Sequence, residues 1–552
     1  MTKYIFVIGG VISGLGKGVT TGSIGATLKE MGYDKITIKK LDPYLNVDPG
    51  TMNPVEHGEV YVTHDGGETD LDLGYYERIA DVKVSKKNSI SSGRLFWNLL
   101  RKERKGEYLG KTVQLIPHFT DSIKNFIKQD ENKYDFIICE IGGSTGDYEA
   151  LPFLEAVRQI KQENENNVLI CFLTYLVYYQ ASKELKSKPT QVAVKQLMSY
   201  GIKPDLLFAR AEHNVTKSLK LKLANLISIN QKNIITAMNV PSIYQVPLEY
   251  KKEGLINCLI KHFDLIKRRE PNFSKWIKLN KVISGAKEIV KIGVVGKYVE
   301  LEDSYYSVIE ALNSAGWANN VKVELIWINA RNKGEMINKI DSVDGVLVPG
   351  GFGTSGIEEI ISAIKYCREN LIPFMGICLG MQLSTIEFAR NVLGIKNASS
   401  REFGKKSDEF IVDLMKEWKK DSGVVEKRGQ DEDLGGTLRL GSYDTIVKKG
   451  SLAHKLYQKT NFKERHRHRY EVNIKYKKRM EDKGLIFSGL SPDGKLPEII
   501  EIREYNYNGK RIQHPFFIAG QFHPEFNSSP FKAHPMFQGL VKASKINKKN
   551  KN

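Results

Sequence analysis

The sequence predicts an α/β protein built from two doubly wound domains. Three observations lead to this class: short apolar runs alternate with helical stretches, the alternation restarts in mid-chain, and each half contains a glycine-rich turn between a strand and a helix. Strands that alternate with helices form right-handed crossovers and a parallel sheet. We therefore expect one α/β domain in residues 1–267, a connector in 268–290 and a second α/β domain in 291–544.

The apolar runs are predicted to be buried strands. In the first half they are Tyr4–Ile8, Lys35–Ile38, Phe136–Cys139, Val168–Leu173 and Leu206–Phe208. In the second half they are Lys291–Gly296, Val323–Ile328, Gly345–Val348 and Pro373–Ile377. Residues 404–436 are charged and weakly periodic, which indicates a surface excursion, and the Lys- and Asn-rich tail 545–552 is predicted to be disordered.

Composition narrows the function without deciding it. Apolar residues make up 41% of the 552 residues and charged residues 27%, which excludes wholesale disorder, collagen and coiled coil. Lysine and arginine exceed the acids by 83 − 64 = 19, so we expect anionic partners: nucleic acid, a membrane surface or phosphorylated small molecules. Five widely spaced cysteines without a C-x-x-C pair indicate a reducing compartment. The longest apolar run, Val168 to Tyr179, is shorter than the ~20 residues of a membrane span.

A glycine-rich loop joins the first predicted strand to the first helix. It reads Gly9-Gly10-Val11-Ile12-Ser13-Gly14-Leu15-Gly16-Lys17-Gly18-Val19-Thr20. Backbone N–H groups of such a turn approach phosphate oxygens closely, and Lys17 adds a charge for the terminal phosphates. The usual pattern is GxxxxGKS or GxxxxGKT, but here Gly18 replaces the hydroxyl residue. The loop therefore predicts a phosphate site that lacks the usual hydroxyl ligand for Mg²⁺.

Oxygen ligands for a metal must then come from other parts of the first domain. Asp70 and Asp72 would point to one side of an extended segment, because strand side chains alternate. Glu140 ends the predicted strand that begins at Tyr134, where ligands bind in open parallel sheets. Each acid alone is better explained as a solvated surface group. Beside a phosphate loop, they are expected to bind Mg²⁺.

The second domain contains a predicted cysteine nucleophile. In Pro373-Phe374-Met375-Gly376-Ile377-Cys378-Leu379-Gly380-Met381-Gln382 an apolar strand meets a G-x-C-x-G turn and then a helix. This is a nucleophile elbow with Cys in place of Ser, and the helix N-terminus favours the thiolate. His523 and Glu525 would supply the base and the group that orients it. The backbone N–H groups of Gly351 and Leu379 are the expected oxyanion donors.

These motifs resemble a known family. GICLGMQ, with a later HPE and an earlier PGGFG, is similar to triad-type glutamine amidotransferases. Three segments of the first half resemble the CTP synthase family: KLDPYLNVDPGTMNPVEHGEV from Lys40, DGGETDLDLGYYER from Asp65 and KSKPTQ from Lys186. The resemblance covers roughly residues 1–540. It implies an N-terminal P-loop-like synthase domain and a C-terminal triad-type glutamine amidotransferase domain.

The resemblance also implies the reaction and its regulators. ATP would phosphorylate O4 of UTP, and ammonia would displace the phosphate at C4 to give CTP. The ammonia would be released from glutamine in the second domain and travel internally, or be supplied free. The expected cofactor is Mg²⁺, with GTP as activator and CTP as feedback inhibitor. The resemblance implies a cytoplasmic homotetramer with no nucleic acid or membrane partner, and it leaves filament formation open.

Site residues follow by match to the family motifs. The catalytic residues are Cys378, His523, Glu525, Lys17 and Lys40. The ATP site comprises Gly14, Leu15, Gly16, Lys17, Gly18, Val19, Asp72, Met238, Asn239 and Val240. The UTP and CTP site comprises Ser13, Asp147, Tyr148, Glu149, Lys186, Ser187, Lys188, Pro189, Thr190, Gln191 and Lys222. The glutamine pocket comprises Gly351, Leu379, Gly380, Met381, Gln382, Glu402 and Arg469, and the metal ligands are Asp72 and Glu140.

Lys186 and Lys188 are expected to share one side of an extended segment before Pro189, where two ammonium groups would suit a triphosphate. On composition alone they are better explained as solvated lysines, and it is the resemblance that favours the triphosphate site. Near this segment the chain departs from the family pattern. Tyr178 replaces a usual Pro, Ser187 a usual Thr, and Val192-Ala193 a common His-Ser pair. These changes bear on feedback inhibition and tetramer affinity rather than on the reaction.

Parts of the sequence would also suit two other functions, a nucleic-acid binder and a P-loop ATPase. The run Arg465-His466-Arg467-His468-Arg469 and the net charge would suit a nucleic-acid binder, but the run lacks repeated aromatics. A P-loop partitioning or assembly ATPase with an inactive second domain would not need Cys378, His523 and Glu525 together. Release of glutamate from glutamine, with and without nucleotides, discriminates these alternatives.

Overall fold

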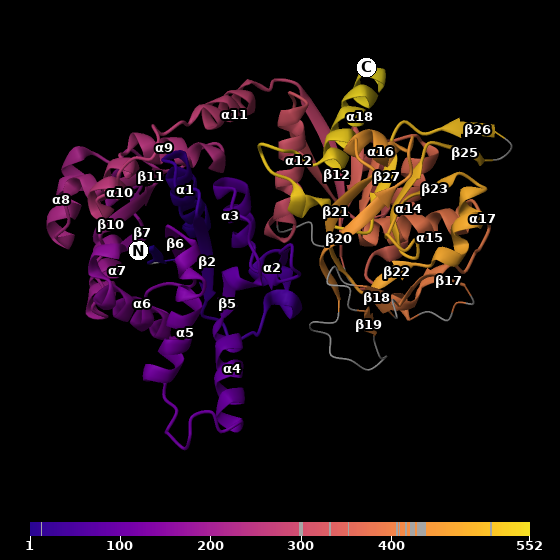
Figure 1. Cartoon of the computed structure of the whole chain (residues 1–552). Coiled ribbons are helices and arrows are strands. Elements are labelled where there is room, and N and C mark those ends of the chain that lie inside the picture. Colours follow the sequence, from indigo (N-terminus) through magenta and orange to yellow (C-terminus); the bar gives the residue numbers. More distant parts are fainter. Residues whose placement is uncertain are drawn as a thin grey trace. The chain divides into compact units, whose positions relative to one another are not determined.

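The computed structural model describes residues 1–10, 12, 14–296, 302–330, 333–351, 353–404, 407, 409–414, 417–419, 425–427, 438–507 and 510–551. The chain forms two compact units, visible in Figure 1. Unit 1 contains Met1–Pro49 and Thr69–Lys281, and unit 2 contains Gly50–Glu68 and Val282–Asn552. A segment from the first half of the sequence therefore belongs to the second unit.

Unit 1 is built on a seven-stranded parallel sheet of strand order β11-β10-β7-β1-β6-β2-β5. The strands are β1 (Lys3–Gly9), β2 (Ile36–Asp42), β5 (Ser89–Ser91), β6 (Phe136–Ile141), β7 (Val168–Tyr175), β10 (Leu206–Ala211) and β11 (Ile234–Met238). All five strands predicted for this half are present. No clear sequence signal marks β5 and β11, which form the two edges of the sheet.

Helices cover both faces of this sheet, as a doubly wound fold requires. One face packs against α4 (Ser92–Arg104), α5 (Thr120–Lys128), α6 (Leu151–Glu163), α7 (Lys188–Ser199) and α8 (Lys217–Ile227). On the other face lie α1 (Lys17–Glu30), α3 (Asp72–Ala80) and α9 (Val246–Lys252). Alternation along β2 directs Lys39 to the α5 side, where its ammonium donates to the Phe126 carbonyl at 2.7 Å. Its neighbour Lys40 points to the α1 side.

Unit 2 contains a nine-stranded mixed sheet of order β13-β12-β14-β15-β27-β24-β23-β20-β21. The parallel part is β12 (Ile289–Gly296), β13 (Lys322–Asn329), β14 (Gly345–Val348), β15 (Phe374–Ile377) and β27 (Phe517–Gly520). The antiparallel part is β24 (Pro497–Ile502), β23 (Leu485–Leu490), β20 (Arg439–Val447) and β21 (Asn461–His468). The four predicted strands lie in the parallel part. The antiparallel part differs from the all-parallel sheet expected from strand–helix alternation.

Helices also cover both faces of the second sheet. On one face, α12 (Tyr306–Ala318), α16 (Leu452–Tyr457) and α18 (Pro535–Lys551) pack in one apolar cluster. On the other face, α13 (Lys333–Asp341), α14 (Ile357–Glu369), α15 (Leu379–Asn391) and α17 (Lys477–Glu481) pack in another. The segment expected to be a connector contains α11 (Ser274–Gly285), and the division between the two units falls within this helix.

The C-terminal tail corrects our expectation of disorder. Helix α18 extends to Lys551. Lys548 donates to the Ile289 carbonyl at 2.6 Å, and Lys551 donates to the carbonyls of Asp341 and Val343 at 3.0 and 2.8 Å. The lysines that suggest a solvated tail by composition thus bind backbone carbonyls. The predicted surface excursion at 404–436 lies mostly outside the described residues, which there include β17 (Phe410–Leu414).

The segment Gly50–Glu68 is held on unit 2 by hydrogen bonds. It contains α2 (Pro54–His57) and β3 (Tyr61–Val62), and β4 (Glu68–Thr69) closes a hairpin with β3. The Ser442 N–H in β20 donates to the His64 carbonyl at 2.8 Å, and the Glu59 carboxylate accepts the Ser307 N–H at 2.9 Å.

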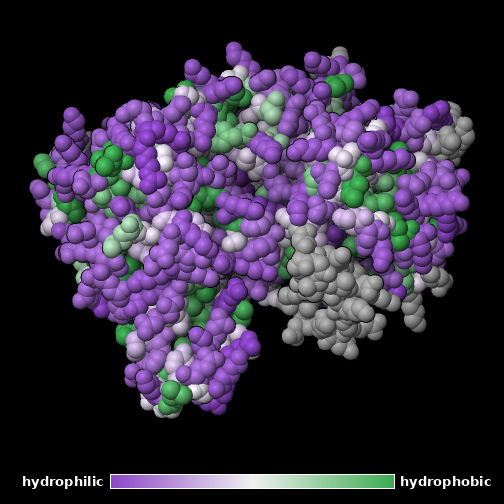
Figure 2. Space-filling model, in the orientation of Figure 1, coloured by the Kyte–Doolittle hydropathy of each residue, from purple (hydrophilic) through white to green (hydrophobic). Residues whose placement is uncertain are grey.

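The face of the molecule in Figure 2 is mostly hydrophilic, with small scattered apolar patches. Within the described ranges, every helix is too short or too polar to cross a membrane.

Candidate functional site

The glycine-rich loop leads from β1 to α1, whose first residue is Lys17. Gly14 and Gly16 have φ values of 72° and 87°, a left-handed conformation that glycine adopts without strain. The Lys17 ammonium folds back along the loop and donates to the Gly143 carbonyl at 2.8 Å. Burial lowers the pKa of Lys17, while Glu140 nearby raises it. The predicted site residue Ser13 and its loop neighbour Val11 lie outside the described residues.

Lys40 is the centre of a buried cluster of carboxylates. Its ammonium bonds to Asp72 and lies 3.3 Å from Glu140 Oε1, 3.5 Å from Asp42 Oδ1 and 3.9 Å from Asp70 Oδ1. Burial alone would lower the pKa of Lys40, but these carboxylates raise it well above its usual value. Burial and the charge of Asp72 raise the pKa of Glu140 to about 7, against the opposing effect of Lys40.

The position of Asp72 explains why residue 18 is glycine. A Cβ atom added to Gly18 would lie 2.3 Å from Asp72 Oδ1 and 2.8 Å from Tyr75 Cδ2, so even alanine would collide with both residues. The usual serine or threonine at this position of the loop would thus collide with the Asp72 carboxylate. Our prediction of an extended Asp70–Asp72 segment is wrong, because Asp72 begins helix α3. Both acids still reach Lys40, because the Asp72 N–H donates to Asp70 Oδ1 at 3.0 Å and folds the turn.

The other predicted nucleotide residues follow several strands of the same sheet. Asp147, Tyr148 and Glu149 come after β6, and Asp147 Oδ2 accepts the Ser144 N–H at 2.6 Å. The segment from Lys186 to Gln191 joins β9 (Glu184–Lys186) to α7 and follows β7. Lys222 lies on α8, and Met238 ends β11 before Asn239 and Val240. Since β6, β7 and β11 belong to one parallel sheet, these segments share its carboxyl edge.

The expected alternation of Lys186 and Lys188 is wrong. Ser187 has the helical values φ −90° and ψ −4°, and Lys188 begins α7 because Pro189 is favoured in the first turn of a helix. Lys186 instead ion-pairs with Glu184, and both lysines are exposed. Among the departures from the family pattern, the Tyr178 ring contacts the His213 ring in a tilted arrangement, with centroids 3.7 Å apart.

In unit 2, Cys378 lies in a strained turn between β15 and α15. Its φ of 51° and ψ of −99° are unusual for a residue with a side chain. Two glycines make the turn compact: a Cβ on Gly380 would lie 2.5 Å from the Val348 carbonyl oxygen, and a Cβ on Gly376 would lie 2.8 Å from Gly380. The Cys378 N–H donates to the Gly520 carbonyl at 2.7 Å. This is the elbow geometry that the G-x-C-x-G pattern predicts.

His523 and Glu525 lie beside the cysteine at the end of β27. Nδ1 of His523 is 2.6 Å from Glu525 Oε1, and both side chains are buried. Burial alone would lower the pKa of His523, but Glu525 and Cys378 raise it to about 10. A Cβ on Gly350 would lie 2.6 Å from His523 Cε1, so the glycine-rich turn after β14 packs directly against the imidazole. The three predicted triad residues are thus brought together.

A cavity of about 560 Å³ opens beside these residues, and His523 and Glu525 form part of its wall. Gly351, Glu402 and Arg469, which we predicted for the glutamine pocket, also line it. The remaining predicted pocket residues, Leu379, Gly380, Met381 and Gln382, lie buried in the first turn of α15. There Gln382 Nε2 donates to the Tyr470 carbonyl at 2.9 Å.

Sequence reasoning missed several residues at this site. Gln521 Nε2 donates to Cys378 Sγ at 3.7 Å, and the Arg467 carbonyl lies 3.8 Å from the same sulfur. Gly50, Met52 and Val60 line the cavity. No sequence signal links this segment to the second domain, because the link is a tertiary contact across more than half of the chain.

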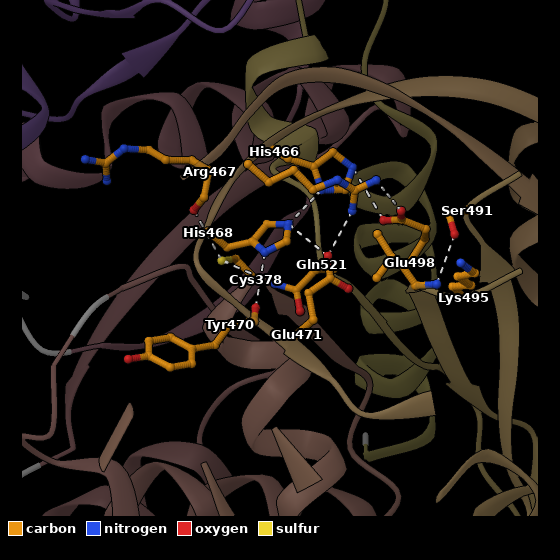
Figure 3. A network of polar contacts seen from close by, with 12 residues as sticks. Cys378, His466, Arg467, His468, Tyr470, Glu471, Ser491, Lys495, Glu498 and Gln521 are labelled. Atoms are coloured by element: carbon orange, nitrogen blue, oxygen red, sulfur yellow. Dashed lines mark hydrogen bonds and ion pairs between the residues drawn. The ribbon is translucent and has the colours of Figure 1, made fainter. Parts of the chain in front are cut away.

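Behind Cys378 lies a buried polar network, shown in Figure 3. Arg439 donates to Glu471 Oε1 at 3.0 Å and to Glu498 Oε1 at 2.8 Å. His466 Nδ1 is 3.0 Å from His468 Nε2. Burial and the charge of Arg439 lower the pKa of both histidines well below the usual value. The Arg-His run is therefore part of a buried strand, which argues against a nucleic-acid surface.

Comparisons with known proteins agree with this organisation. Residues 3–265 match the family model for the CTP synthase N-terminus, and residues 300–543 match that for class-I glutamine amidotransferase. The CTP synthase of Pelagibacter ubique is 50% identical over 551 residues, which cover 99% of this chain and 100% of the relative. The chain belongs to the CTP synthase family. The CTP synthase of Aquifex aeolicus is 49% identical over 544 residues, 98% of each chain.

Among solved structures, the chain is similar to the glutaminase domain of Trypanosoma brucei CTPS with bound acivicin. The identity is 32% and the TM-score 0.40, and the match covers 47% of this chain and 94% of that domain. The two family models match the two α/β parts of the chain in the same order. The first match contains the carboxylate cluster around Lys40, and the second contains Cys378.

Proposed function

We infer that the protein aminates UTP to CTP, with ATP as the phosphoryl donor and with ammonia released from L-glutamine. The observation that carries this inference is the presence in one CTP synthase chain of two different sites. A phosphate loop and carboxylates surround Lys40 in unit 1, and Cys378 with His523 and Glu525 adjoins a cavity in unit 2.

The geometry of unit 2 supports glutamine hydrolysis at Cys378. The Cys378 sulfur attacks the side-chain amide carbon of glutamine, and the N–H groups of Gly351 and Leu379 stabilise the oxyanion. His523 donates a proton to the leaving ammonia and then takes one from the water that hydrolyses the thioester, while Glu525 orients the imidazole. Arg469 and Glu402 in the cavity wall suit the α-carboxylate and α-amine of glutamine.

Phosphoryl transfer uses the charges of unit 1. The backbone of the loop from Gly14 to Val19 binds the phosphates of ATP, and Lys17 and Lys40 neutralise the charge that develops on the transferred group. Met238, Asn239 and Val240 bind on the adenine side. Ammonia then attacks C4 of the phosphorylated uracil, the C4–O bond breaks and inorganic phosphate leaves.

The residues present fit a bound Mg²⁺. Within the described part of the chain, no group of three His, Cys, Asp or Glu side chains is arranged to enclose a metal. Mg²⁺ usually takes one or two carboxylates and completes its ligands with phosphates and water, so Asp72 and Glu140 suffice as protein ligands. Asp42 Oδ2 is buried without a hydrogen-bond partner, which indicates that this cluster is arranged for a further cation or donor. A bound Mg²⁺ would neutralise phosphate charge there.

The regulatory properties are part of the same proposal. The residues that follow β6 and β7, from Asp147 to Glu149 and from Lys186 to Gln191, together with Lys222 and Ser13, bind the triphosphate of UTP and of the inhibitor CTP. GTP activates glutamine hydrolysis, and the active form is a cytoplasmic homotetramer. The position of the segments at one sheet edge supports the shared triphosphate site, and the activator, the homotetramer and the cytoplasmic location rest on family membership alone.

A coupled assay tests the proposal. The protein is given UTP, ATP and Mg²⁺, first with glutamine and then with ammonium, and CTP is followed by absorbance and identified chromatographically. We expect CTP with either nitrogen source and none without ATP. Hydrolysis of glutamine without formation of CTP under either condition would contradict the proposal and leave a glutaminase.

A further inference from the structure

Strand β21 presents two chemically different faces. Arg465 and Arg467 face the segment Gly50–Glu68, whereas His466 and His468 lie in the buried network of Figure 3. This separation follows from the alternation of side chains along a strand. The network holds β21 from one side, and the arginines contact the segment from the other.

Arg467 binds both ends of the segment Gly50–Glu68. Its Nε lies 2.8 Å from Glu68 Oε1, and its Nη2 donates to the Gly50 carbonyl at 3.1 Å. Only 13% of the Arg467 side chain and 5% of the Glu68 side chain are exposed. Breaking one partner of a buried ion pair leaves an uncompensated charge, which is strongly unfavourable. Arg467 therefore holds the two ends of the segment, Gly50 and Glu68, next to each other.

The same arginine touches the nucleophile and the cavity. Its carbonyl oxygen lies 3.8 Å from Cys378 Sγ, and its side chain lines the cavity together with Gly50 and Met52 of the segment. A displacement of the segment would thus remove one wall of the cavity next to the cysteine. Ammonia released there would meet solvent.

The ends of the segment lead directly into the synthase site. Glu68 precedes Asp70 by two positions, and Asp70 and Asp72 pair with Lys40. At the other end, Gly50 follows strand β2, which carries Lys40 itself. The segment is therefore the stretch of chain that joins the wall of the glutaminase cavity to both sides of the carboxylate cluster.

We propose that Arg467, through its ion pair with Glu68, is a positioning residue that couples glutamine hydrolysis to CTP synthesis. This inference rests on the function proposed above. The pair keeps the segment Gly50–Glu68 against the glutaminase cavity, so that ammonia is retained and consumed. Without the pair the Glu68 end of the segment loses its contact with Arg467, while Arg465 still holds Tyr61 and Val62, and glutamine is hydrolysed without an equal amount of CTP.

The variant Glu68→Gln tests the pair, because it keeps the shape of the side chain and removes its charge. With saturating ATP, UTP and glutamine, we measure glutamate and CTP together. Wild type should form them in equimolar amounts, and in Glu68→Gln the ratio of CTP to glutamate should fall about tenfold. Ammonia-dependent synthesis should stay within about twofold of wild type. Lys463→Gln is the matched control: it lies on the same strand, pairs with Asp444 at 3.4 Å and should keep the equimolar ratio.

The outcomes separate the two proposals. Equimolar glutamate and CTP in Glu68→Gln would overturn the coupling role. A parallel loss of glutamine-dependent and ammonia-dependent synthesis would overturn it too, because the pair would then serve stability alone. If Glu68→Gln does not fold, Glu68→Asp takes its place, because it keeps the charge on a shorter side chain. This variant should also lower the ratio of CTP to glutamate. An equimolar ratio in Glu68→Asp would contradict the coupling role. A wild-type protein that makes no CTP from glutamine would instead refute the proposed function.

Discussion

Replacing Gly18 by serine would restore the hydroxyl of an ordinary phosphate loop, yet we expect this change to abolish CTP synthesis. In the variant Gly18→Ser the added Cβ would lie 2.3 Å from Asp72 Oδ1, well under the 3.0 Å below which neighbouring atoms must shift. The ring of Tyr75 blocks a second direction, with Cδ2 at 2.8 Å. The Asp72 carboxylate must therefore leave the position in which it bonds to Lys40.

The size of the effect can be estimated from two contributions. Overpacking of a tightly packed position costs about 1–3 kcal/mol. Loss of the charge-assisted hydrogen bond between Asp72 and Lys40 costs about 1.5–3 kcal/mol more. If both costs add to the activation free energy of phosphoryl transfer, the rate of CTP synthesis falls by about a hundredfold or more, since ~1.4 kcal/mol corresponds to a factor of ten.

The assay is ammonia-dependent CTP formation by Gly18→Ser, with glutamine hydrolysis at Cys378 measured in parallel. Synthesis should be lost and hydrolysis should persist. The control is Gly285→Ser, a helical glycine with no atom within 4 Å of an added Cβ, which should retain both activities. Near-normal CTP synthesis by Gly18→Ser would contradict the predicted displacement of Asp72, because the serine side chain and the Asp72 carboxylate would then fit together.

Two further predictions concern single carboxylates. Glu140→Gln should weaken synthesis at least about tenfold with glutamine and with ammonia, since it removes a proposed Mg²⁺ ligand, while glutamine hydrolysis remains; a normal rate across a Mg²⁺ titration would contradict the assignment. Glu525→Gln removes the charge that raises the pKa of His523 to about 10, so the imidazolium should lose its proton at lower pH. The alkaline fall of glutamine hydrolysis should therefore shift to lower pH, and an unchanged pH profile would rule this out.

The parts of the fold that follow local patterns could be predicted from sequence. Strands such as Val168–Tyr175 are buried on both faces and therefore appear as continuous apolar runs. The Cys378 elbow was predictable because only glycine fits at positions 376 and 380, where added atoms would strike Gly380 and Val348. The roles of His523 and Glu525 were predictable because a cysteine nucleophile needs a base and a group that orients it, whereas their approach to Cys378 depends on the pairing of β15 with β27.

The parts that depend on tertiary contacts could not be predicted. The segment Gly50–Glu68 has the composition of an ordinary loop, and its position depends on contacts with residues far along the chain, among them the ion pair of Glu68 with Arg467 and the hydrogen bond from the Ser442 N–H to the His64 carbonyl. The helical start at Asp72 depends on the Asp70 side chain, which competes with an extended backbone. The composition of the tail is typical of a disordered terminus, but Lys548 and Lys551 donate hydrogen bonds to backbone carbonyls of distant residues.

We propose that two separate sites in one chain divide the release of ammonia from its use. The most direct measurement is CTP formation by Cys378→Ala, with ATP and UTP, from glutamine and then from ammonium at equal nitrogen concentration. Cys378→Ala should form no CTP from glutamine, because no thioester can form, and its ammonia-dependent rate should be close to that of wild type. Loss of ammonia-dependent synthesis in a variant that remains folded, or continued synthesis from glutamine, would contradict it.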